Sequence, residues 1–383
     1  MDKPTVQDIF HRFYPAYLDQ YSPSPVQAKV AHNIMNCKTG AYGANVCVCE
    51  DCGFVQIHYN SCRNRCCPMC QAVPKEMWMD ARREDVLDAP YFHLVFMVPD
   101  ILNPVIYSNQ RLLYDALYHA ASSTISELTA DPKHLGAKVG YICILHTWGS
   151  EMNFHPHIHT ILLGGGLASN NQWKDNGENF FLPIRVISKM FRGKYLEELK
   201  RLWEEDKLVF HGTAEKFRNH YTFKELLDSC YGMDWIPHCK KTFNGAQTVI
   251  KYLGKYTHRI AVSNHRTVRM DDDTVTFLVK DYRNEGQWKE LTISGVEFVR
   301  RFLMHVPPRR FVRIRHYGLL CSRTKSQKLT LCRNLLGCKK YLSKLRDMEM
   351  PEILEHLYGI KVCVCKACGG HLGKPQMKMP LRC

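Results

Sequence analysis

The sequence predicts an α+β protein in which antiparallel strand pairs and helices follow a small cysteine-rich unit. Residues 138–148 and 155–163 are apolar, β-prone stretches joined by a short polar link, as in a hairpin. Residues 274–279 and 288–293 alternate apolar and polar side chains around a second turn. Eight of the 18 cysteines fall between Cys37 and Cys70, which indicates a metal-bound unit near the start.

Composition and charge favour a globular protein that binds nucleic acid. The chain has 383 residues, 45% of them hydrophobic, enough for the cores of two or three domains. A formal net charge of +15 favours a polyanionic partner, and nucleic acid is a better candidate than a ribosome or a membrane surface. No apolar run could span a bilayer, and the first residues lack a signal pattern. We therefore expect a cytoplasmic protein with no membrane partner.

Residues 1–88 are expected to form an N-terminal helix and a zinc-binding, DNA-contacting domain. The first helix is indicated by apolar residues at helical spacing, namely Ile9, Phe10, Phe13, Tyr14, Tyr17 and Leu18. A second helix is expected over 73–87, and Ala89-Pro90 marks the boundary with the next domain.

The cysteine cluster contains two C-x₂-C knuckles fourteen residues apart, and their four thiolates can surround one tetrahedral zinc ion. The four predicted ligands are Cys49, Cys52, Cys67 and Cys70. The residues that could replace them or hold a second ion are Cys37, Cys47, Cys62, Cys66 and His58. Buried reduced thiols are the alternative interpretation. Arg63 and Arg65 lie within this segment and are predicted DNA contacts.

Residues 89–308 are expected to form the second, larger domain. Besides the two hairpins, its expected elements are strands over 91–99 and 233–243 and helices over 110–128, 184–223, 246–259 and 295–304. Three glycines at 164–166 are predicted to end the second strand of the first hairpin.

Residues 309–383 are expected to form a basic C-terminal region. Its densest basic run contains Arg309, Arg310, Arg313, Arg315 and His316, which we place against DNA phosphates rather than in an ion-pair network. Cys365 and Cys368 look like half of a zinc ribbon. Candidates for the other half are Cys363, His371, Cys332, Cys338 and Cys383.

Extended spacing in the segment from His155 to His159 points three imidazoles to one side of a sheet. A polar edge strand is the alternative, but repeated imidazoles on a buried strand need a common partner, and a metal ion supplies one. Two or three imidazoles with water and substrate oxygens suit Mg²⁺ or Mn²⁺, and Mn²⁺ better matches nitrogen ligands. The candidates for a third protein ligand beside His157 and His159 are His155, Glu151, His146 and Gln247.

Tyr252 and Tyr256 lie four residues apart, so a helix would put both phenols on one face, about 6 Å apart along the axis. Packing on a sheet is the alternative role. The basic residues interleaved with them suit a phosphate backbone and are Lys251, Lys255, His258 and Arg259. A metal held by imidazoles beside two phenols can polarise a phosphodiester while a phenolate attacks it.

Four segments together resemble the HUH nucleases, and within them the two-tyrosine transposases of the insertion sequence 91 family. HUH denotes histidine, a bulky hydrophobe and histidine, matched here by His157-Ile158-His159. The other matching segments are 59–71, Phe92-His93-Leu94-Val95-Phe96 and 252–259, in the family's order.

This resemblance implies an N-terminal zinc-binding domain and, over 89–308, an HUH catalytic nuclease and transferase domain with a central antiparallel sheet flanked by helices. It implies that His157 and His159 bind the catalytic metal and that Tyr252 and Tyr256 are the nucleophiles. The implied activity is rolling-circle transposition. One strand of single-stranded DNA is cut to give a 5′-phosphotyrosine and a free 3′-hydroxyl, and is then joined to a target without ATP. The implied partners are the hairpin ends of a mobile element and target DNA.

Two other functions fit the same residues. A replication initiator or relaxase-like nickase would use the same chemistry at an origin. A non-catalytic zinc-dependent DNA-binding protein would use the histidines and tyrosines only for packing. Cleavage of a labelled oligonucleotide with Mn²⁺ separates the enzymes from the binding protein.

Overall fold

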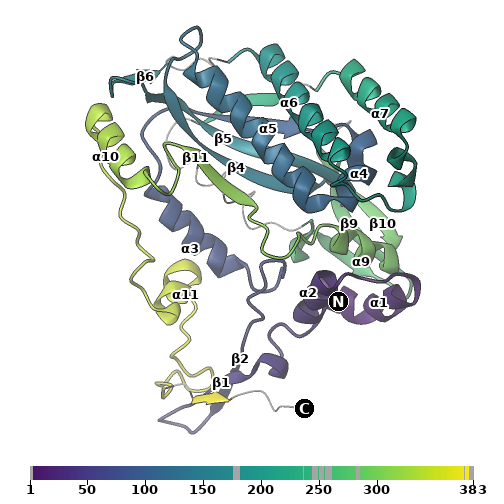
Figure 1. The fold of residues 1–383 in the computed structure, drawn as a ribbon. Helices are drawn as coiled ribbons and strands as arrows, with labels where there is room; N and C mark the ends of the chain where they lie inside the picture. The colour runs from purple at the N-terminus through teal and green to yellow at the C-terminus, as the bar shows by residue number, and fades with distance from the viewer. Residues whose placement is uncertain are drawn as a thin grey trace.

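The computed structural model of the protein describes residues 3–175, 182–235, 237–243, 249, 254, 261–281, 285–374 and 376–378. Its centre is an antiparallel sheet in which β5 (Phe154–Leu167) is the middle strand (Figure 1). The strands run in the order β11 (Ile314–Gly318), β4 (Lys138–Trp148), β5, β3 (Tyr91–Met97) and β7 (His238–Phe243), and β6 (Trp173–Asp175) pairs with β5. The predicted α+β class, with a central antiparallel sheet flanked by helices, is confirmed.

One face of this sheet is covered by helices. Alternate residues of β4, such as Cys143 and Leu145, enter a large apolar core on this side, as strand geometry requires. Phe96 of β3 packs on Phe191 with 5.0 Å between ring centroids. The covering helices are α4 (Asn103–Ser108), α5 (Gln110–Ala130), α6 (Ile184–Glu204) and α7 (His220–Gly232), with the 3₁₀ turns η2 (Asp100–Leu102) and η3 (Gly212–Arg218). This layer lies along the top of Figure 1.

The opposite face has a smaller core beside a polar site. Ile142 and Ile144 of β4 and Ile161 of β5 pack there with Met79 of α3 (Ala72–Arg83) and Leu329 of α10 (Lys325–Leu336). Because the period of a strand is two, the histidines at even positions on β4 and odd positions on β5 share this face.

A second antiparallel sheet forms another core with helices from both sides of residue 89. It contains β8 (Thr267–Met270), β9 (Thr274–Asp281) and β10 (Gln287–Ser294), and it packs with α1 (Val6–Gln20), α2 (Pro25–Met35) and α9 (Gly295–Met304). The short turn η4 (Asn264–Arg266) precedes β8. Phe10 of α1 meets Phe302 of α9 edge to face, 5.1 Å between centroids. This core therefore joins segments on both sides of residue 89.

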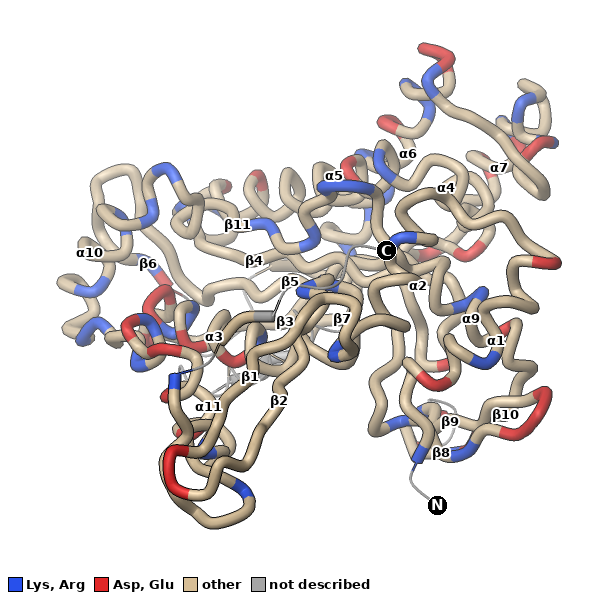
Figure 2. The backbone as a smooth tube through the Cα atoms, turned by 90° about the horizontal axis from the view of Figure 1, so that it is seen from below, with Lys and Arg blue, Asp and Glu red and all other residues tan. Residues whose placement is uncertain are grey.

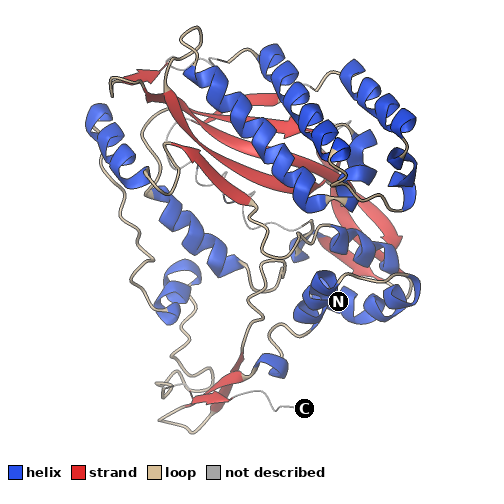
Figure 3. Ribbon diagram, in the orientation of Figure 1, coloured by secondary structure: helices blue, strands red, loops and turns tan. Residues whose placement is uncertain are grey.

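A third, small sheet lies away from the central one, at the bottom of Figures 1 and 3. It contains β1 (Ala44–Val48), β2 (Val55–Tyr59) and β12 (Gln376–Lys378), after the 3₁₀ turn η1 (Gly40–Tyr42). The helix α11 (Met350–Tyr358) lies on the path from α10 to this sheet. Among the residues that the structure describes, no helix is both long enough and apolar enough to cross a bilayer.

Three expected elements differ from the structure. Gly164–Gly166 do not end their strand, because β5 continues to Leu167 and pairs with β6. A Cβ on Gly166 would lie 2.4 Å from the Lys138 carbonyl oxygen, so only glycine allows this close backbone approach. The segment 184–223 is not one helix but α6, η3 and the start of α7, which the Asn219 side chain caps. The strand expected from 233 begins at His238.

Candidate metal centre and DNA interface

Three imidazoles meet on the open side of the central sheet. His157 and His159 stand on the middle strand β5, and His146 lies on β4 directly opposite His157 in the strand register. All three residues are buried, with 4 to 8% of their surface exposed. Each offers a ring nitrogen, and these nitrogens lie within 4.8 Å of one another. The sheet therefore presents a preformed set of three nitrogen ligands.

The spacing of the ring nitrogens fits one divalent cation. The Nε2 atoms of His157 and His159 are 3.1 Å apart. Two ligand atoms at about 2.1 Å from one ion and at right angles to each other are about 3.0 Å apart. Without an ion, this contact is a hydrogen bond only if one of the rings carries a proton on Nε2. Burial lowers the pKa of His157 to about 4 and also lowers that of His159, so both rings are neutral at pH 7.

Hydrogen bonds at the outer nitrogens orient these rings. His157 Nδ1 donates to the carbonyl oxygen of His155 over 2.7 Å, which leaves Nε2 free of a proton. His159 Nδ1 lies 2.9 Å from Nε2 of His93, a buried residue of β3. With His159 as the donor, its Nε2 also carries a lone pair toward the shared point. The His155 carbonyl thus favours the metal-binding tautomer of His157, and His93 can accept the proton that gives His159 the same tautomer.

The structure describes three of the four candidates for a third ligand. The structure brings His146 to the pair. His155 does not join it, since its Nδ1 lies 3.2 Å from a carboxylate oxygen of Asp100. Glu151 is exposed in the turn between β4 and β5, and Gln247 lies outside the described residues.

The predicted nucleophiles and their basic neighbours also lie outside the described residues: Tyr252, Tyr256, Lys251, Lys255, His258 and Arg259. Two residues of the same segment are described. Val249 is buried in the small core on the histidine face of the sheet. A Cβ on Gly254 would meet the sulfur of Met79, which belongs to that core.

Among the described residues the cysteines form two clusters of four, and neither has the set of partners that the sequence predicted. Cys67 and Cys70 lie with Cys37 and Cys62. Cys49 and Cys52 lie far along the β1–β2 hairpin, with partners from the C-terminal segment. The predicted set of Cys49, Cys52, Cys67 and Cys70 around one ion is therefore corrected, because the hairpin carries the first knuckle away from the second. Cys66, the other alternative ligand, is buried in the core with α1 and α9.

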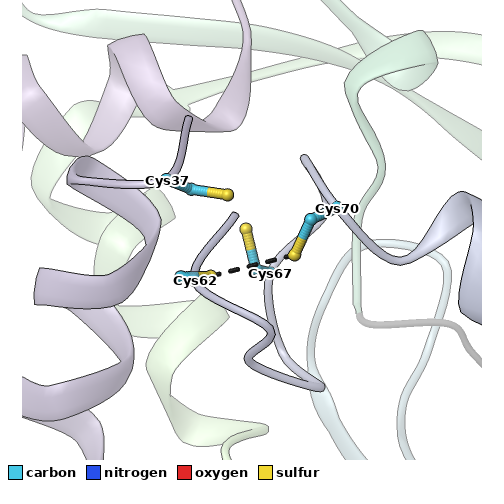
Figure 4. Close-up of side chains that lie close together, drawn as sticks. All are labelled: Cys37, Cys62, Cys67 and Cys70. Carbon is cyan, nitrogen blue, oxygen red and sulfur yellow. Dashed lines mark hydrogen bonds between the residues drawn. The ribbon is translucent and has the colours of Figure 1, made fainter. Parts of the chain in front are cut away.

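Figure 4 shows the first cluster, in which the four thiol groups point toward a common centre. The Sγ atoms of Cys62 and Cys70 are 3.8 Å apart, close to the spacing of about 3.8 Å between thiolates around a tetrahedral zinc ion. Hydrogen bonds with Cys62 and Cys70 raise the pKa of Cys67, whereas hydrogen bonds from Cys62 and Cys67 lower the pKa of Cys70 to about 2. Zinc binds cysteine as the thiolate, so a bound dication would favour ionisation of these four thiols.

Some of the predicted DNA-contacting arginines are exposed, and others already have partners within the protein. Arg63 and Arg65 are exposed, although Arg65 donates to the carbonyl oxygen of Phe311. The prediction that Arg315 lies against DNA phosphates rather than in an ion pair is corrected. Its guanidinium forms an ion pair with Asp115, and its Cζ lies 4.0 Å from the ring centroid of Tyr118. The reason is that 314–318 form strand β11 of the central sheet, so Arg315 faces α5.

Arg313, immediately before β11, is half-buried rather than exposed. Burial lowers the pKa of its guanidinium from the usual value, and Cys66 and Arg65 are close enough to influence it.

A basic cleft of about 350 Å³ opens beside the first cysteine cluster. Its cationic lining comes from Lys29 of α2, Arg65, Arg309 and Arg310. Figure 2 shows further lysines and arginines along α10 and near β11. Cations from separate segments around one opening suit a phosphate backbone.

One residue beside these sites, His93, had no role predicted from the sequence, and another, Cys37, was predicted only as an alternative ligand. His93 is a lone histidine in an apolar strand, and only its place across from β5 reveals its contact with His159. Cys37 stands ten residues before the next cysteine, without knuckle spacing, and its only sequence signal is the cysteine-rich context.

Comparisons with known proteins agree with this architecture. A family described as "Putative transposase" matches residues 140–328, and one described as "Transposase zinc-binding domain" matches residues 9–98. The chain is 40% identical to "Putative transposase y4qJ" of Sinorhizobium fredii, over 95% of this chain and 93% of that protein. It is 30% identical to "Transposase for insertion sequence element IS801" of Pseudomonas savastanoi pv. phaseolicola, over 79% of this chain and 72% of that protein.

Among solved structures, a conjugative relaxase TrwC in complex with oriT DNA aligns at 16% identity, with a TM-score of 0.24, over 29% of this chain and 44% of that chain. A copper-bound form of the same complex aligns over 52% of this chain and 69% of that one, at 14% identity with a TM-score of 0.26.

The cysteine clusters and the two family matches thus indicate a zinc-binding protein that acts on DNA. The chain belongs to the transposases of the insertion sequence 91 type, which carry an N-terminal zinc-binding domain.

Proposed function

We propose that this transposase is an HUH single-strand DNA endonuclease and strand transferase of the rolling-circle type. His146, His157 and His159 hold a catalytic Mg²⁺ or Mn²⁺, and Tyr252 and Tyr256 are the nucleophiles. The observation that carries the proposal is the convergence of three buried imidazoles on one point of the sheet. Buried imidazoles without a common partner would be costly, whereas a divalent cation satisfies all three.

The two described residues of the tyrosine segment support the nucleophile assignment. Val249 and Gly254 flank Tyr252 in the sequence; Val249 belongs to the core on the histidine face of the sheet, and Gly254 lies against Met79 of that core. Met79 belongs to the same core as Ile144, whose strand partner is His159. These contacts of Val249 and Gly254 support the proposal that Tyr252 is a nucleophile of the histidine site.

The proposed reaction exchanges one ester for another. When bound, the divalent cation would polarise the scissile phosphate. The phenol oxygen of one tyrosine forms a bond to phosphorus while the bond from phosphorus to the 3′ oxygen breaks. The phenol loses its proton to a base or solvent, and the departing 3′ oxygen gains one. A 3′-hydroxyl of target DNA can reverse the step, because the phosphotyrosine ester retains the energy of the original bond.

The substrate is proposed to be single-stranded DNA at the hairpin ends of a mobile element. The cleft lined by Lys29, Arg65, Arg309 and Arg310 supplies cations beside the zinc-binding domain. Arg63 is exposed at the same segment and is proposed to contact phosphates as well. Such contacts position the strand and make binding dependent on salt.

The test is detection of a covalent protein–DNA adduct on a denaturing gel. Full-length protein is incubated with Mn²⁺ and a labelled single-stranded oligonucleotide that carries one element end. We expect an adduct with the natural protein, none with the double variant Tyr252→Phe and Tyr256→Phe, and none with His157→Ala or His159→Ala. Chelation of the metal is expected to have the same effect.

Matched controls separate chemistry from folding. Tyr221→Phe removes a phenol that is 76% exposed on α7, and His119→Ala removes an exposed imidazole of α5. Both should leave the adduct yield unchanged. An adduct that persists in the double tyrosine variant would overturn the nucleophiles. If the natural protein retards the oligonucleotide on a native gel but never forms an adduct, the non-catalytic DNA-binding function is correct instead.

A further inference from the structure

The second cysteine cluster joins residues that are more than 300 positions apart in the chain. It contains Cys49 and Cys52 of the β1–β2 hairpin together with Cys365 and Cys368 of the C-terminal segment. The "Transposase zinc-binding domain" match ends at residue 98 and therefore contains only half of this set. We propose that these four cysteines bind a second structural zinc ion, which fastens the C-terminal segment to the N-terminal hairpin.

The distances between the thiol groups are those of ligands around one ion. Cys49 Sγ lies 3.5 Å from Cys368 Sγ, and Cys52 Sγ lies 3.8 Å from Cys365 Sγ. All four sulfurs lie within 4.8 Å of one another. Thiolates bound to a tetrahedral zinc ion are about 3.8 Å apart, since each lies about 2.3 Å from the metal. A disulfide would need a separation of about 2.05 Å and would pair two sulfurs, not gather four.

The two halves of the cluster repeat one backbone arrangement. In the first knuckle, Gly53 N donates to Cys49 O over 3.0 Å, and Cys49 N donates to Phe54 O over 2.9 Å. The knuckle of Cys365 and Cys368 has the same two hydrogen bonds, from Gly369 N to Cys365 O at 3.0 Å and from Cys365 N to Gly370 O at 2.8 Å. The glycines have φ values of 70° and 77°, which favour glycine.

Backbone N–H groups of the knuckle of Cys365 and Cys368 point at its sulfur atoms. Ala367 N donates to Cys365 Sγ and Gly370 N donates to Cys368 Sγ, both over 3.4 Å. A thiolate accepts such bonds better than a thiol does, and zinc binds the thiolate form. The first cluster shows the same feature, where Asn64 N donates to Cys62 Sγ over 3.4 Å.

This part of the protein has too small an apolar core to hold its own shape. The core cluster contains Cys47, Cys49, Cys365 and Leu372, and two of these four residues are proposed ligands. Val55 and Ile57 of β2 are half-exposed instead of buried. Small units of this kind commonly depend on a structural metal, because burial alone does not offset the entropy of ordering the chain.

The path of the C-terminal segment fits a fastening role. After α10 the chain runs beside α3, where the buried carboxylate of Asp80 accepts hydrogen bonds from Tyr341 Oη at 2.6 Å and from Leu345 N at 3.0 Å. It then passes through α11 to the small sheet, where β12 pairs with β1 (Figure 1). The proposed ion would link the C-terminal segment to the turn of the β1–β2 hairpin, while the pairing of β12 with β1 holds the same segment to the strand.

The first experiment counts zinc ions in the purified full-length protein by inductively coupled plasma mass spectrometry. We expect two per chain in the natural protein and one in Cys365→Ser/Cys368→Ser. The variant Cys49→Ser/Cys52→Ser should also retain one. The quadruple variant should again retain one, because all four residues serve the same ion. Cys363→Ser is the matched control, since Cys363 is exposed, two residues from Cys365, and should leave two ions.

A second measurement avoids variants that fail to fold. Chymotrypsin sites at Tyr42 and Tyr59 flank the pair Cys49 and Cys52. Sites at Tyr358 and Leu372 flank the pair Cys365 and Cys368. Native mass spectrometry of a digest should show the two peptides together with one zinc ion, and a chelator should separate them. A natural protein with one zinc ion per chain, or hairpin and tail peptides that separate while zinc is still bound, would overturn the proposal. Neither readout depends on DNA cleavage, so failure of the proposed function would not affect it.

Discussion

Replacement of His93 tests whether the strands around the histidine site tune its affinity for metal. His93 is 4% exposed, and its Nε2 lies 2.9 Å from His159 Nδ1. In His93→Leu the metal-binding tautomer of His159 would leave a buried N–H group without this acceptor. Such a loss costs about 1–3 kcal/mol, and outer partners of metal ligands typically contribute 10- to 100-fold in affinity. We therefore expect Mn²⁺ binding to weaken 10- to 100-fold.

The assay is a titration of Mn²⁺ followed by electron paramagnetic resonance of the free ion, with adduct formation as a second readout. His93→Gln is the matched variant, because its amide oxygen can accept the same hydrogen bond, and it should retain most of the affinity. Leucine is apolar and suits a buried strand, so the thermal unfolding temperature should change little. An unchanged Mn²⁺ affinity in His93→Leu would refute the reasoning that links His93 to the metal site.

Other changes act on stability and on DNA binding. Gly166→Ala should lower the unfolding free energy by about 2 kcal/mol or more, because the new Cβ would meet backbone that cannot move aside. Gly193→Ala, in an open part of α6, should instead raise the unfolding free energy by up to about 1 kcal/mol. Denaturant unfolding compares the two variants, and equal effects would contradict this view. Burial raises the pKa of Asp80, but hydrogen bonds from Ser343 and Tyr341 outweigh it and lower the pKa. The Asp80 contribution is therefore present above about pH 4 and lost as pH falls below it, so protease cleavage of 338–349 should increase in acid and in Asp80→Asn at pH 7. Arg310→Ala should reduce the salt dependence of DNA binding by about one unit in the log–log slope, and an unchanged slope would remove the cleft from the DNA path.

Local patterns predicted most of the central elements. The strand expected over 138–148 coincides with β4, and the helix expected over 295–304 coincides with α9. These agree because hydrophobic periodicity and short-range caps, such as Ser294 accepting from Glu297 N, act within a few residues.

Elements that depend on distant partners were not predicted. The strand β11 carries arginines and a histidine, and a basic run normally indicates an exposed surface. It forms a strand because β4 offers a free edge to it and Asp115 on α5 pairs with Arg315. Gly164–Gly166 carry a turn signal, yet their lack of side chains lets neighbouring strands approach closely.

The sequence alone determined which chemistry is available: thiolates in knuckles, imidazoles alternating on an apolar strand, and two phenols at helical spacing. Tertiary structure decided which of these groups meet. It placed His146 beside His157 and His159, Cys37 and Cys62 beside Cys67 and Cys70, and Cys365 and Cys368 beside Cys49 and Cys52 of the β1–β2 hairpin. The physical reason is that knuckles and periodic faces arise from neighbouring residues. The sharing of one ion, in contrast, depends on strand register and packing between residues that are distant in the chain.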